Sequence, residues 1–550
     1  MPATGSTLLA QSLKRQGVDT LFFLMGGPML AAESACIEQG IRSIDVRHEQ
    51  AAAMMAHAYA RLRNRPGVCI TASGPGTLNL GTGLATSLMD CTPVVALGGA
   101  SSMSEFGTGA FQEFDQVAAM RPLVKWADRV LEARRVPELI DKAFTIAMSG
   151  KPGPVYLDFP GDLLYRSMDE ATAVWPTYGR ERALGRAGAD PATLETIARL
   201  LEQARKPVVV TGSGVLWSDA SQALNAFVDA SGVPFYTTPQ GRGVIAEDHP
   251  HCYLNARSQA FREADLFIVV GTRLNYVLSH LQAPRFNADA KVVRIDIDPA
   301  EVASTPRLDA GVAGDARRVL EQLAEACAGR IGPDRFEPWR RSLSEAHLKR
   351  SRAQEALLSS DRAPIHPLRL CKEVRDFMDR DAVLVVDGQE ILNFGRQSIP
   401  TFVPGHRLNS GTFGTMGVGL PYALGAQAAC PDKQVICLHG DGSLGMNFME
   451  MDTAVRHGLP VITVVSLNGG WTADPQKAKP GRELGLTRYH DMAAALGCRT
   501  FHVEEPARIR PALEAAREAA REGVPSLVNV RTDPDAQATT AKFTTFYDAA

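Results

Sequence analysis

The sequence predicts an α/β protein made of three domains, each a doubly wound parallel sheet. Its 550 residues exceed what one hydrophobic core usually holds, so several domains are expected. Short apolar strand patterns alternate with helical patterns along most of the chain, which is typical of parallel sheets covered by helices on both faces. Polar stretches near 166–190 and 330–364 interrupt this alternation. They divide the chain into domains over 1–165, 190–330 and 365–535, followed by a tail over 536–550.

The first domain begins with an amphipathic helix over 7–17, and strands and helices then follow in turn. Apolar runs predict strands over 20–25, 42–46, 68–72, 92–97 and 154–158. An Ala- and Met-rich helix is expected over 50–63. Because strands joined by crossover helices run parallel, their carboxyl ends should meet at one edge of the sheet, where ligands bind.

The other two domains repeat this pattern. In the second, strands are predicted over 207–211, 264–270 and 291–295. In the third, a helix is predicted over 449–457, and strands are predicted over 382–386, 435–438, 461–466 and 526–530. The polar stretch over 330–364 is helix-prone but has few core positions, which predicts a connector between the second and third domains.

Composition limits the class of protein. A hydrophobic content of 45%, a charged content of 22% and a formal charge of −3 are typical of a soluble globular protein and give no reason to expect nucleic acid or an anionic membrane as partner. Nine scattered cysteines, with no C-x-x-C pair, predict reduced thiols. No secretory start and no long apolar stretch is present, so we expect a cytoplasmic protein.

A Gly-Asp-Gly turn and an Asn-Gly-Gly turn end two neighbouring predicted strands of the third domain. Asp441 follows the strand over 435–438, and Asn468 follows the strand over 461–466. Carboxylate and amide oxygens suit Mg²⁺, and the glycines allow close approach of a diphosphate. The alternative is a plain turn between strand and helix. The spacing favours a site for a metal ion and a diphosphate.

This pair of turns resembles the motif by which thiamine-diphosphate enzymes bind Mg²⁺ and the diphosphate of their cofactor. The resemblance implies that Asp441, Asn468 and the carbonyl of Gly470 are the metal ligands. It also implies that the cofactor is contacted by neighbouring residues, namely Gly440, Gly442, Ser443 and Trp471.

Glu49 ends a predicted strand and begins the helix rich in alanine. Arg47-His48-Glu49 resembles the glutamate motif of the same enzymes. There the carboxyl group shares a proton with the cofactor's pyrimidine ring, away from water, and so promotes loss of the thiazolium C2 proton. The alternative is a solvated glutamate stabilised by the helix dipole.

Two further glycine-rich segments resemble parts of the same site. Residues 73–79 resemble a loop that meets the pyrimidine end of the cofactor across a dimer interface, which implies contacts from Gly74 and Asn79. Residues 411–417 resemble the segment whose large apolar side chain bends the cofactor, which implies roles for Gly414 and Met416. The alternatives are a tight turn and a methionine that fills the core.

The resemblance covers nearly the whole chain, which is similar to the acetolactate-synthase-like superfamily of thiamine-diphosphate enzymes. The order implied is a pyrimidine-binding domain, a middle domain and a diphosphate-binding domain, in a homodimer or homotetramer with active sites at the dimer interface. Residues 109–114, 157–162 and 271–276 resemble the oxalyl-CoA decarboxylase and 2-hydroxyacyl-CoA lyase branch. That branch implies ADP in the middle domain, held by Arg273 and Asp296. The alternative for Arg273 is a surface ion pair.

Two departures distinguish the activities within this branch. Phe111-Gln112 and Trp471-Thr472 stand where the decarboxylases show Tyr-Glu and Ile-Tyr, which favours a lyase. The resemblance then implies cleavage of a 2-hydroxyacyl-CoA to an aldehyde or ketone and formyl-CoA. Gln112 and His48 would contact substrate oxygens. Glu483 would be an acid or base, or else a solvated loop residue.

Other functions stay open. They are a decarboxylase or carboligase on 2-keto acids, as in acetolactate synthase or benzaldehyde lyase, oxalyl-CoA decarboxylase, and a regulatory protein that kept the fold. The tail ends in Phe543, Phe546 and Tyr547 after Lys542. We expect it to close over the active site when the acyl-CoA binds, with Lys542 near a CoA phosphate.

Overall fold

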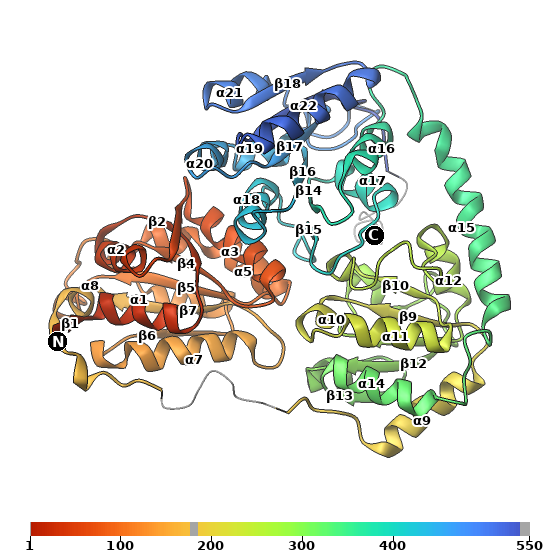
Figure 1. Cartoon of the computed structure of the whole chain (residues 1–550), viewed down its shortest axis with the longest axis horizontal. Coiled ribbons are helices and arrows are strands. Elements are labelled where there is room, and N and C mark those ends of the chain that lie inside the picture. The colour runs from red at the N-terminus through yellow and green to blue at the C-terminus, as the bar shows by residue number, and fades with distance from the viewer. Residues whose placement is uncertain (1, 177–184, 539–550) are drawn as a thin grey trace.

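Three parallel sheets form the protein, which confirms the predicted fold class (Figure 1). The structure is a computed structural model that describes residues 2–176 and 185–538. The tail residues Lys542, Phe543, Phe546 and Tyr547 lie outside the described residues, so their role stays a prediction. Among the described residues, no helix is both long enough and apolar enough to cross a membrane.

The N-terminal sheet has six strands in the order β3-β2-β4-β5-β7-β6. In chain order these are β2 (Thr20–Leu24), β3 (Arg42–Asp45), β4 (Gly67–Thr71), β5 (Val94–Ala100), β6 (Trp126–Arg129) and β7 (Val155–Pro160). The helices are α1 (Gly5–Arg15), α2 (Leu30–Glu38), α3 (Glu49–Arg63), α4 (Pro75–Asn79), α5 (Gly81–Met89), α6 (Gln116–Met120), α7 (Val136–Met148) and α8 (Gly161–Tyr165).

The five-stranded middle sheet has the order β10-β9-β11-β12-β13. Its strands are β9 (Pro207–Thr211), β10 (Phe235–Thr237), β11 (Leu266–Val270), β12 (Lys291–Asp296) and β13 (Leu308–Ala313). Its helices are α9 (Pro191–Gln203), α10 (Ser213–Trp217), α11 (Ser221–Ser231), α12 (Arg257–Glu263), α13 (Pro299–Ala303) and α14 (Ala316–Cys327). The connector is the long helix α15 (Glu337–Leu358), which runs along one side of the molecule (Figure 1).

The C-terminal sheet has six strands in the order β15-β14-β16-β17-β19-β18. These are β14 (Val383–Asp387), β15 (Arg407–Asn409), β16 (Val435–Gly440), β17 (Ile462–Leu467), β18 (Arg499–Val503) and β19 (Ser526–Arg531). The helices are α16 (Pro367–Phe377), α17 (Glu390–Ser398), α18 (Gly419–Ala429), α19 (Asp441–Met446), α20 (Glu450–Arg456), α21 (Tyr489–Ala495) and α22 (Ile509–Arg521).

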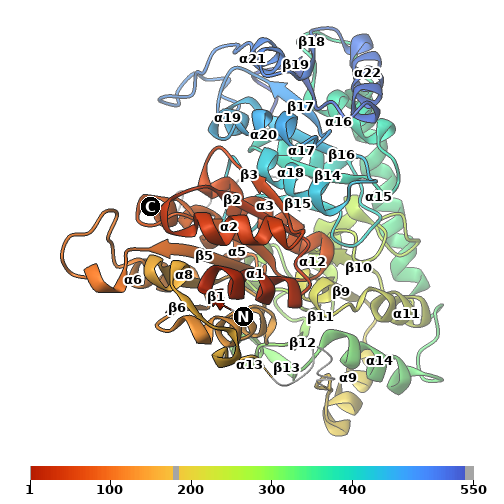
Figure 2. The ribbon, with the colours of Figure 1, turned by 60° about the vertical axis from the view of Figure 1, so that its left-hand side comes forward.

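The N-terminal and C-terminal domains share one hydrophobic core. In β5, Val95 and Leu97 belong to the core under α1 and α7, whereas Val94 and Ala96 face the opposite core, because successive strand residues point to opposite faces. That second core continues through α3 into α18, and the two helices lie side by side (Figure 2). Gly425 of α18 lies against the backbone of Met55, where a side chain would not fit. The N-terminal and C-terminal domains are therefore held against one another through α3 and α18.

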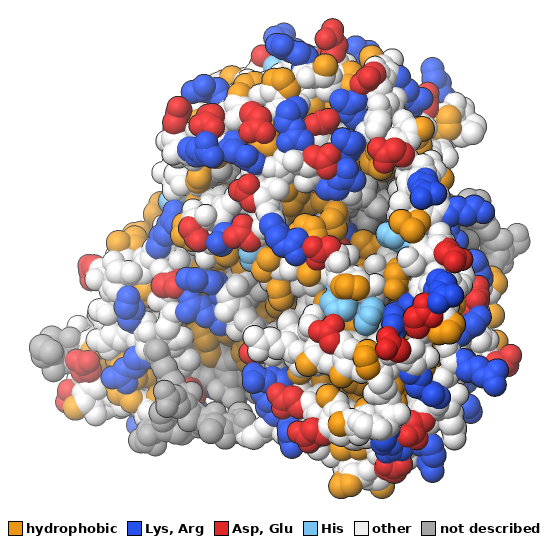
Figure 3. Space-filling model, turned by 45° about the vertical axis from the view of Figure 1, so that its right-hand side comes forward, with side chains coloured by type: hydrophobic (Ala, Val, Ile, Leu, Met, Phe, Trp, Pro, Cys, Tyr) orange, Lys and Arg blue, Asp and Glu red, His pale blue; other side chains and the backbone are white. Residues whose placement is uncertain are grey.

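Five strands of the three parallel sheets were missing from the sequence prediction, and all lie at sheet edges: β6, β10, β13, β15 and β18. β10 and β15 have three residues each, and β6, β13 and β18 are partly exposed, so none has a continuous apolar run. The stretch predicted as a linker over 166–190 also contains β8 (Ser167–Asp169), which pairs antiparallel with β1 (Pro2–Thr4). Charged side chains of both signs are interspersed over the face in Figure 3.

Candidate active site

Asp441 is a buried carboxylate at the carboxyl end of β16. Its Oδ1 accepts the backbone N–H of Gly442 (2.9 Å), and its Oδ2 accepts that of Gly469 (2.8 Å), which follows the neighbouring strand β17. Burial raises the pKa of Asp441 to about 6. Backbone N–H groups, and no Lys or Arg of the described part of the chain, are the groups that oppose this shift. A buried carboxylate with two backbone donors and no cationic partner fits a site for a divalent cation.

The residues that the sequence places at the diphosphate end of the site lie together around one cavity. Asp441 and Asn468 face it from adjacent strand ends. The other predicted residues that line it are Met416, Gly440, Gly442, Ser443, Gly470 and Trp471. Gly414 is not among the lining residues, although it adopts a positive φ of 75° two positions before Met416.

Trp471 packs directly on the turn that carries Asp441. A Cβ at Gly442 would lie 2.6 Å from the Trp471 ring, so only glycine fits there. Ser443 donates to the carbonyl of Gly440 (3.0 Å), and the Tyr489 hydroxyl donates to the carbonyl of Asp441 (3.0 Å). These contacts fix the backbone on which a diphosphate would rest.

Part of the cavity wall was not found from the sequence. Gly388, Gln389 and Glu390 follow β14, and Thr532 and Asp533 follow β19. Polar residues directly after a predicted strand were the available signal, because ligands bind outside the carboxyl ends of parallel strands.

Glu483 lies in a loop beside this cavity but is not among its lining residues. The loop pairs with the end of β17, since Trp471 N–H donates to the carbonyl of Arg482 (3.1 Å) and Leu484 N–H to that of Gly469 (2.9 Å). The Glu483 side chain is 76% exposed and forms an ion pair with Arg482 at 3.3 Å. This arrangement favours the solvated alternative over an acid–base role.

Glu49 belongs to a second group of predicted residues, at the carboxyl edge of the N-terminal sheet. It is the buried first residue of α3, and its Oε2 accepts a hydrogen bond from Asn79 Nδ2 (2.9 Å). Gln112 accepts from the Ser73 hydroxyl (2.7 Å), and a Cβ at Gly74 would lie 2.7 Å from the Gln112 carbonyl oxygen. Glu49, Gly74 and Asn79, which the resemblance places at the pyrimidine end of the cofactor, therefore lie close to Gln112, the predicted substrate contact.

His48 caps the helix that Glu49 begins. Its side chain is exposed, and its Nδ1 accepts the backbone N–H of Gln50 at 3.2 Å. The preceding residue is anchored to the C-terminal domain, because the buried Glu450 accepts the backbone N–H of Arg47 (3.0 Å). Burial raises the pKa of Glu450 to about 7. This anchor fixes the start of α3 without bringing Glu49 into the wall of the Asp441 cavity.

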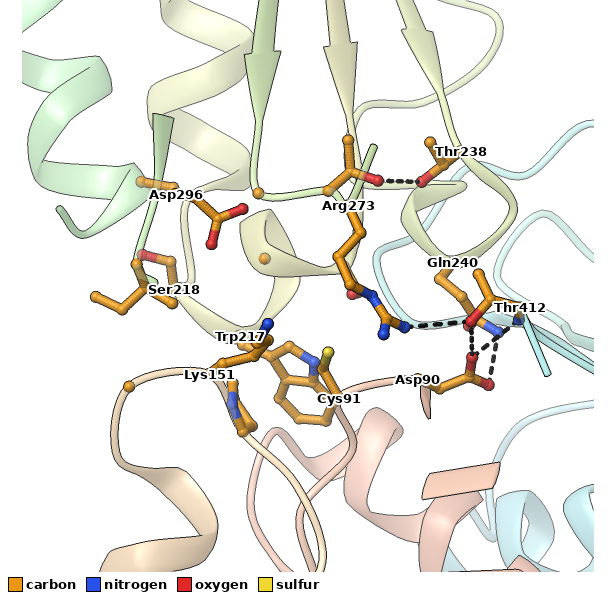
Figure 4. Close-up of a pocket in the computed structure, with 18 of the residues that line it drawn as sticks. Asp90, Cys91, Lys151, Trp217, Ser218, Thr238, Gln240, Arg273, Asp296 and Thr412 are labelled. Carbon is orange, nitrogen blue, oxygen red and sulfur yellow. Dashed lines mark hydrogen bonds between the residues drawn. The ribbon is translucent and has the colours of Figure 1, made fainter. Parts of the chain in front are cut away.

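A larger cavity of about 230 Å³ lies where the three domains meet (Figure 4). Arg273 and Asp296 both line it, together with Lys151 and Trp217. Arg273 Nη2 donates to the Thr412 hydroxyl (3.2 Å), so it is not a surface ion pair. Burial raises the pKa of Asp296, and Arg294 pairs with it at 2.9 Å.

Family comparisons identify the class of enzyme that contains these two groups of residues. The model for the thiamine pyrophosphate enzyme N-terminal TPP binding domain matches residues 3–119. The model for the central domain matches residues 194–323, and that for the C-terminal TPP binding domain matches residues 393–530. The chain belongs to the thiamine pyrophosphate enzymes. The predicted family is confirmed, and its cofactor is thiamine diphosphate.

Curated relatives of this thiamine pyrophosphate enzyme carry three different activities in their names. A probable acetolactate synthase of Mycobacterium bovis is 35% identical over 96% of this chain and 95% of its own. 2-Hydroxyacyl-CoA lyase 1 of Homo sapiens is 31% identical over 97% of this chain and 95% of its own. Oxalyl-CoA decarboxylase of Escherichia coli is 30% identical over 97% of this chain and 95% of its own. Because these sequence identities are so similar, they do not assign one of the three activities to this chain.

The thiamine pyrophosphate enzyme also has a cluster of arginines that the sequence analysis missed. Arg242, Arg257, Arg396 and Arg407 interact electrostatically at the boundary of the middle and C-terminal domains, and we call them the arginine cluster. Arg242 pairs with the buried Glu247, with its Nε 2.7 Å from Oε1. These arginines are spread over 165 positions of the chain, so no local sequence pattern indicates that they lie together.

The arginine cluster is short of negative charge among the described residues. Arg407 is 1% exposed, and its three guanidinium nitrogens have no hydrogen-bond partner there. Burial and neighbouring arginines lower the pKa of Arg257 to about 9 and that of Arg396 to about 10. Uncompensated buried cations are costly, so the cluster is a candidate site for an anion.

Proposed function

We propose that this chain is a 2-hydroxyacyl-CoA lyase that releases formyl-CoA and an aldehyde or ketone. The observation that carries the proposal is the arginine cluster. Glu390 at the start of α17 lines the diphosphate cavity, and Arg396 lies in the last turn of the same helix, about 9 Å farther along its axis. A free 2-keto acid is too short to span this distance from the cavity, whereas a CoA thioester is long enough for its phosphate groups to approach Arg396.

The cofactor site fits this chemistry. Thiamine diphosphate, when bound, supplies the nucleophilic carbon and the electron sink for breaking a carbon–carbon bond. Asp441, Asn468 and the Gly470 carbonyl would hold Mg²⁺ against the diphosphate. Glu49, oriented by Asn79, would hold the proton shared with the pyrimidine ring. Gln112 and His48 would contact the substrate oxygens.

The active site would combine two chains. Among the described residues, the diphosphate cavity is lined by the C-terminal domain, and Glu49 lies outside it. A second copy would bring its own Glu49, Asn79 and Gln112 to the open side of that cavity. We therefore propose a homodimer, or a dimer of dimers, in which each site takes Glu49 and Asp441 from different chains.

Product analysis distinguishes the proposed lyase from its rivals. The purified chain would be incubated with thiamine diphosphate, Mg²⁺ and separate 2-hydroxyacyl-CoAs, 2-keto acids and oxalyl-CoA. Formyl-CoA formed from a 2-hydroxyacyl-CoA, together with the aldehyde or ketone, is the expected result. Turnover of 2-keto acids alone would favour the acetolactate-synthase-like alternative. Formyl-CoA from oxalyl-CoA alone would favour the decarboxylase.

The arginine cluster gives a sharper prediction. Arg396→Gln should raise KM for the acyl-CoA about tenfold or more, because charge-assisted hydrogen bonds to phosphate are lost. Affinity for thiamine diphosphate should stay unchanged. Steady-state kinetics and calorimetry measure the two effects. Arg341→Gln, which removes an exposed partner of Glu337 on α15, is the matched control. An unaltered KM in Arg396→Gln would remove the main support for a CoA substrate.

We also propose that the cavity between the three domains binds ADP. Arg273 and Lys151 supply positive charge for a diphosphate, Asp296 can accept from ribose hydroxyls, and Trp217 offers a flat surface for the base. Calorimetry should detect ADP binding to the unaltered chain, and Arg273→Ala should weaken it about tenfold or more. Equal affinities of the two proteins for ADP would contradict this assignment.

A further inference from the structure

The segment over 410–416 connects β15 to the wall of the diphosphate cavity. β15 ends at Asn409, and Met416 lines the cavity. Gly411 and Gly414 both adopt positive φ, at 62° and 75°, and the intervening residues form turns rather than a helix or strand. A segment of this kind is conformationally free unless other groups hold it. One hydrogen bond lies within the segment, from the Gly414 N–H to the Ser410 carbonyl (3.0 Å), so the position of Met416 depends mainly on contacts made from outside the segment.

Asp90, the C-cap residue of α5 in the N-terminal domain, makes two of these contacts through its carboxylate. Its side chain is buried, and its Oδ1 accepts both the backbone N–H of Thr412 (3.0 Å) and the Thr412 hydroxyl (3.2 Å). A Cβ at Gly411 would overlap the Asp90 carboxylate. The carboxylate thus both binds the segment and occupies the space that a side chain at position 411 would need.

The other domains reinforce this contact. Gln240 of the middle domain donates to Asp90 Oδ2 (3.0 Å), and the Tyr276 hydroxyl donates to the Thr412 carbonyl (2.8 Å). Figure 4 shows Asp90, Gln240 and Thr412 converging at one side of the cavity between the domains. Nearer to Met416, the hydroxyls of Thr86 and Thr415 lie 2.7 Å apart. The start of the segment is held at a junction of all three domains.

We propose that Asp90 is a positioning residue for Met416, which it fixes against the thiamine cofactor by clamping Gly411 and Thr412. The proposal rests on the cofactor site of the proposed function but on no particular substrate. Buried hydrogen bonds to a carboxylate define one geometry, and a displacement of about 1 Å at a reacting centre can lower a rate about a hundredfold. Without the clamp, Met416 would shift within the wall of the cavity that would hold the cofactor.

A double-mutant cycle tests the proposal in the nucleotide-free holoenzyme. The readout is the rate at which the bound cofactor exchanges its C2 proton with D₂O, which needs no substrate. Asp90→Ala should slow this exchange about tenfold to a hundredfold, and Asp90→Asn should restore most of it. Met416→Ala should slow it by a similar factor. Because both changes act through one side chain, the double variant should be no slower than the slower single variant.

A stability effect alone would give a different pattern. If the double variant slows exchange by the product of the two single factors, the proposal is overturned. A normal exchange rate in Asp90→Ala would also overturn it. If Asp90→Ala does not fold, Thr412→Val, which removes only the hydroxyl, replaces it in the same cycle with the same criterion. Ser87→Ala removes another buried hydroxyl of α5 that bonds to His57 and should leave exchange unchanged. A wrong substrate assignment would alter none of these exchange rates.

Discussion

Glu49→Gln should lower kcat at least about a hundredfold while thiamine diphosphate still binds. In the unaltered chain, Asn79 Nδ2 donates to Glu49 Oε2 at 2.9 Å. A glutamine keeps the size of the side chain, and its amide oxygen can still accept this hydrogen bond. It cannot share a proton with the pyrimidine ring. The variant should therefore remove the C2 proton more slowly, which lowers kcat, while cofactor affinity changes little.

Steady-state kinetics and calorimetric titration with the cofactor check both parts of this expectation. Glu138→Gln is a matched control, since Glu138 also lies in the first turn of an N-terminal-domain helix but is only partly buried and pairs with Arg135. Near-normal kcat in Glu49→Gln would refute the assignment of Glu49. A parallel loss of cofactor affinity would instead indicate that Glu49 acts mainly in binding.

The central strands were predictable because burial on both faces leaves a clear sequence pattern. β5, β11 and β16 are continuous apolar runs, which parallel strands covered by helices require. The edge strands β6, β13 and β18 are partly exposed, and their composition differs little from that of loops. The register of β1 with β8 joins residues more than 160 positions apart, so only tertiary packing reveals it.

The candidate site was predictable where it depends on single strand ends. Asp441 and Asn468 follow adjacent strands, so their proximity follows from parallel topology alone. Asp90 and the arginine cluster acquire their roles only when domains meet. Asp90 contacts Thr412 from 322 positions away, and nothing around either residue indicates the other. Contacts between domains depend on helix packing, such as that of α3 on α18, which one sequence does not encode in a local pattern.

Asp441→Ala should abolish measurable Mg²⁺-dependent binding of thiamine diphosphate, with affinity lowered at least about a hundredfold. The cation would bridge the protein and the diphosphate, so its affinity and that of the cofactor should fall together. Burial raises the pKa of Asp441 to about 6. The metal needs the ionised carboxylate, so in the unaltered enzyme cofactor affinity should weaken as the pH falls through about 6. Titrations at limiting Mg²⁺ measure both effects.

Asp432→Ala, an exposed change in the same domain, is the control for these titrations and should bind the cofactor normally.

Mixing the Asp441→Ala and Glu49→Gln chains tests whether the active site is shared between two chains. Glu49→Gln and Asp441→Ala chains should each be nearly inactive alone. If every site takes Glu49 from one chain and Asp441 from another, a hybrid dimer has one site with both residues intact and one with neither. Dissociated and reassociated mixtures should then regain part of the activity. Hybrid dimers confirmed by mass that remain inactive would contradict the shared site, and Glu49 would have to act within its own chain.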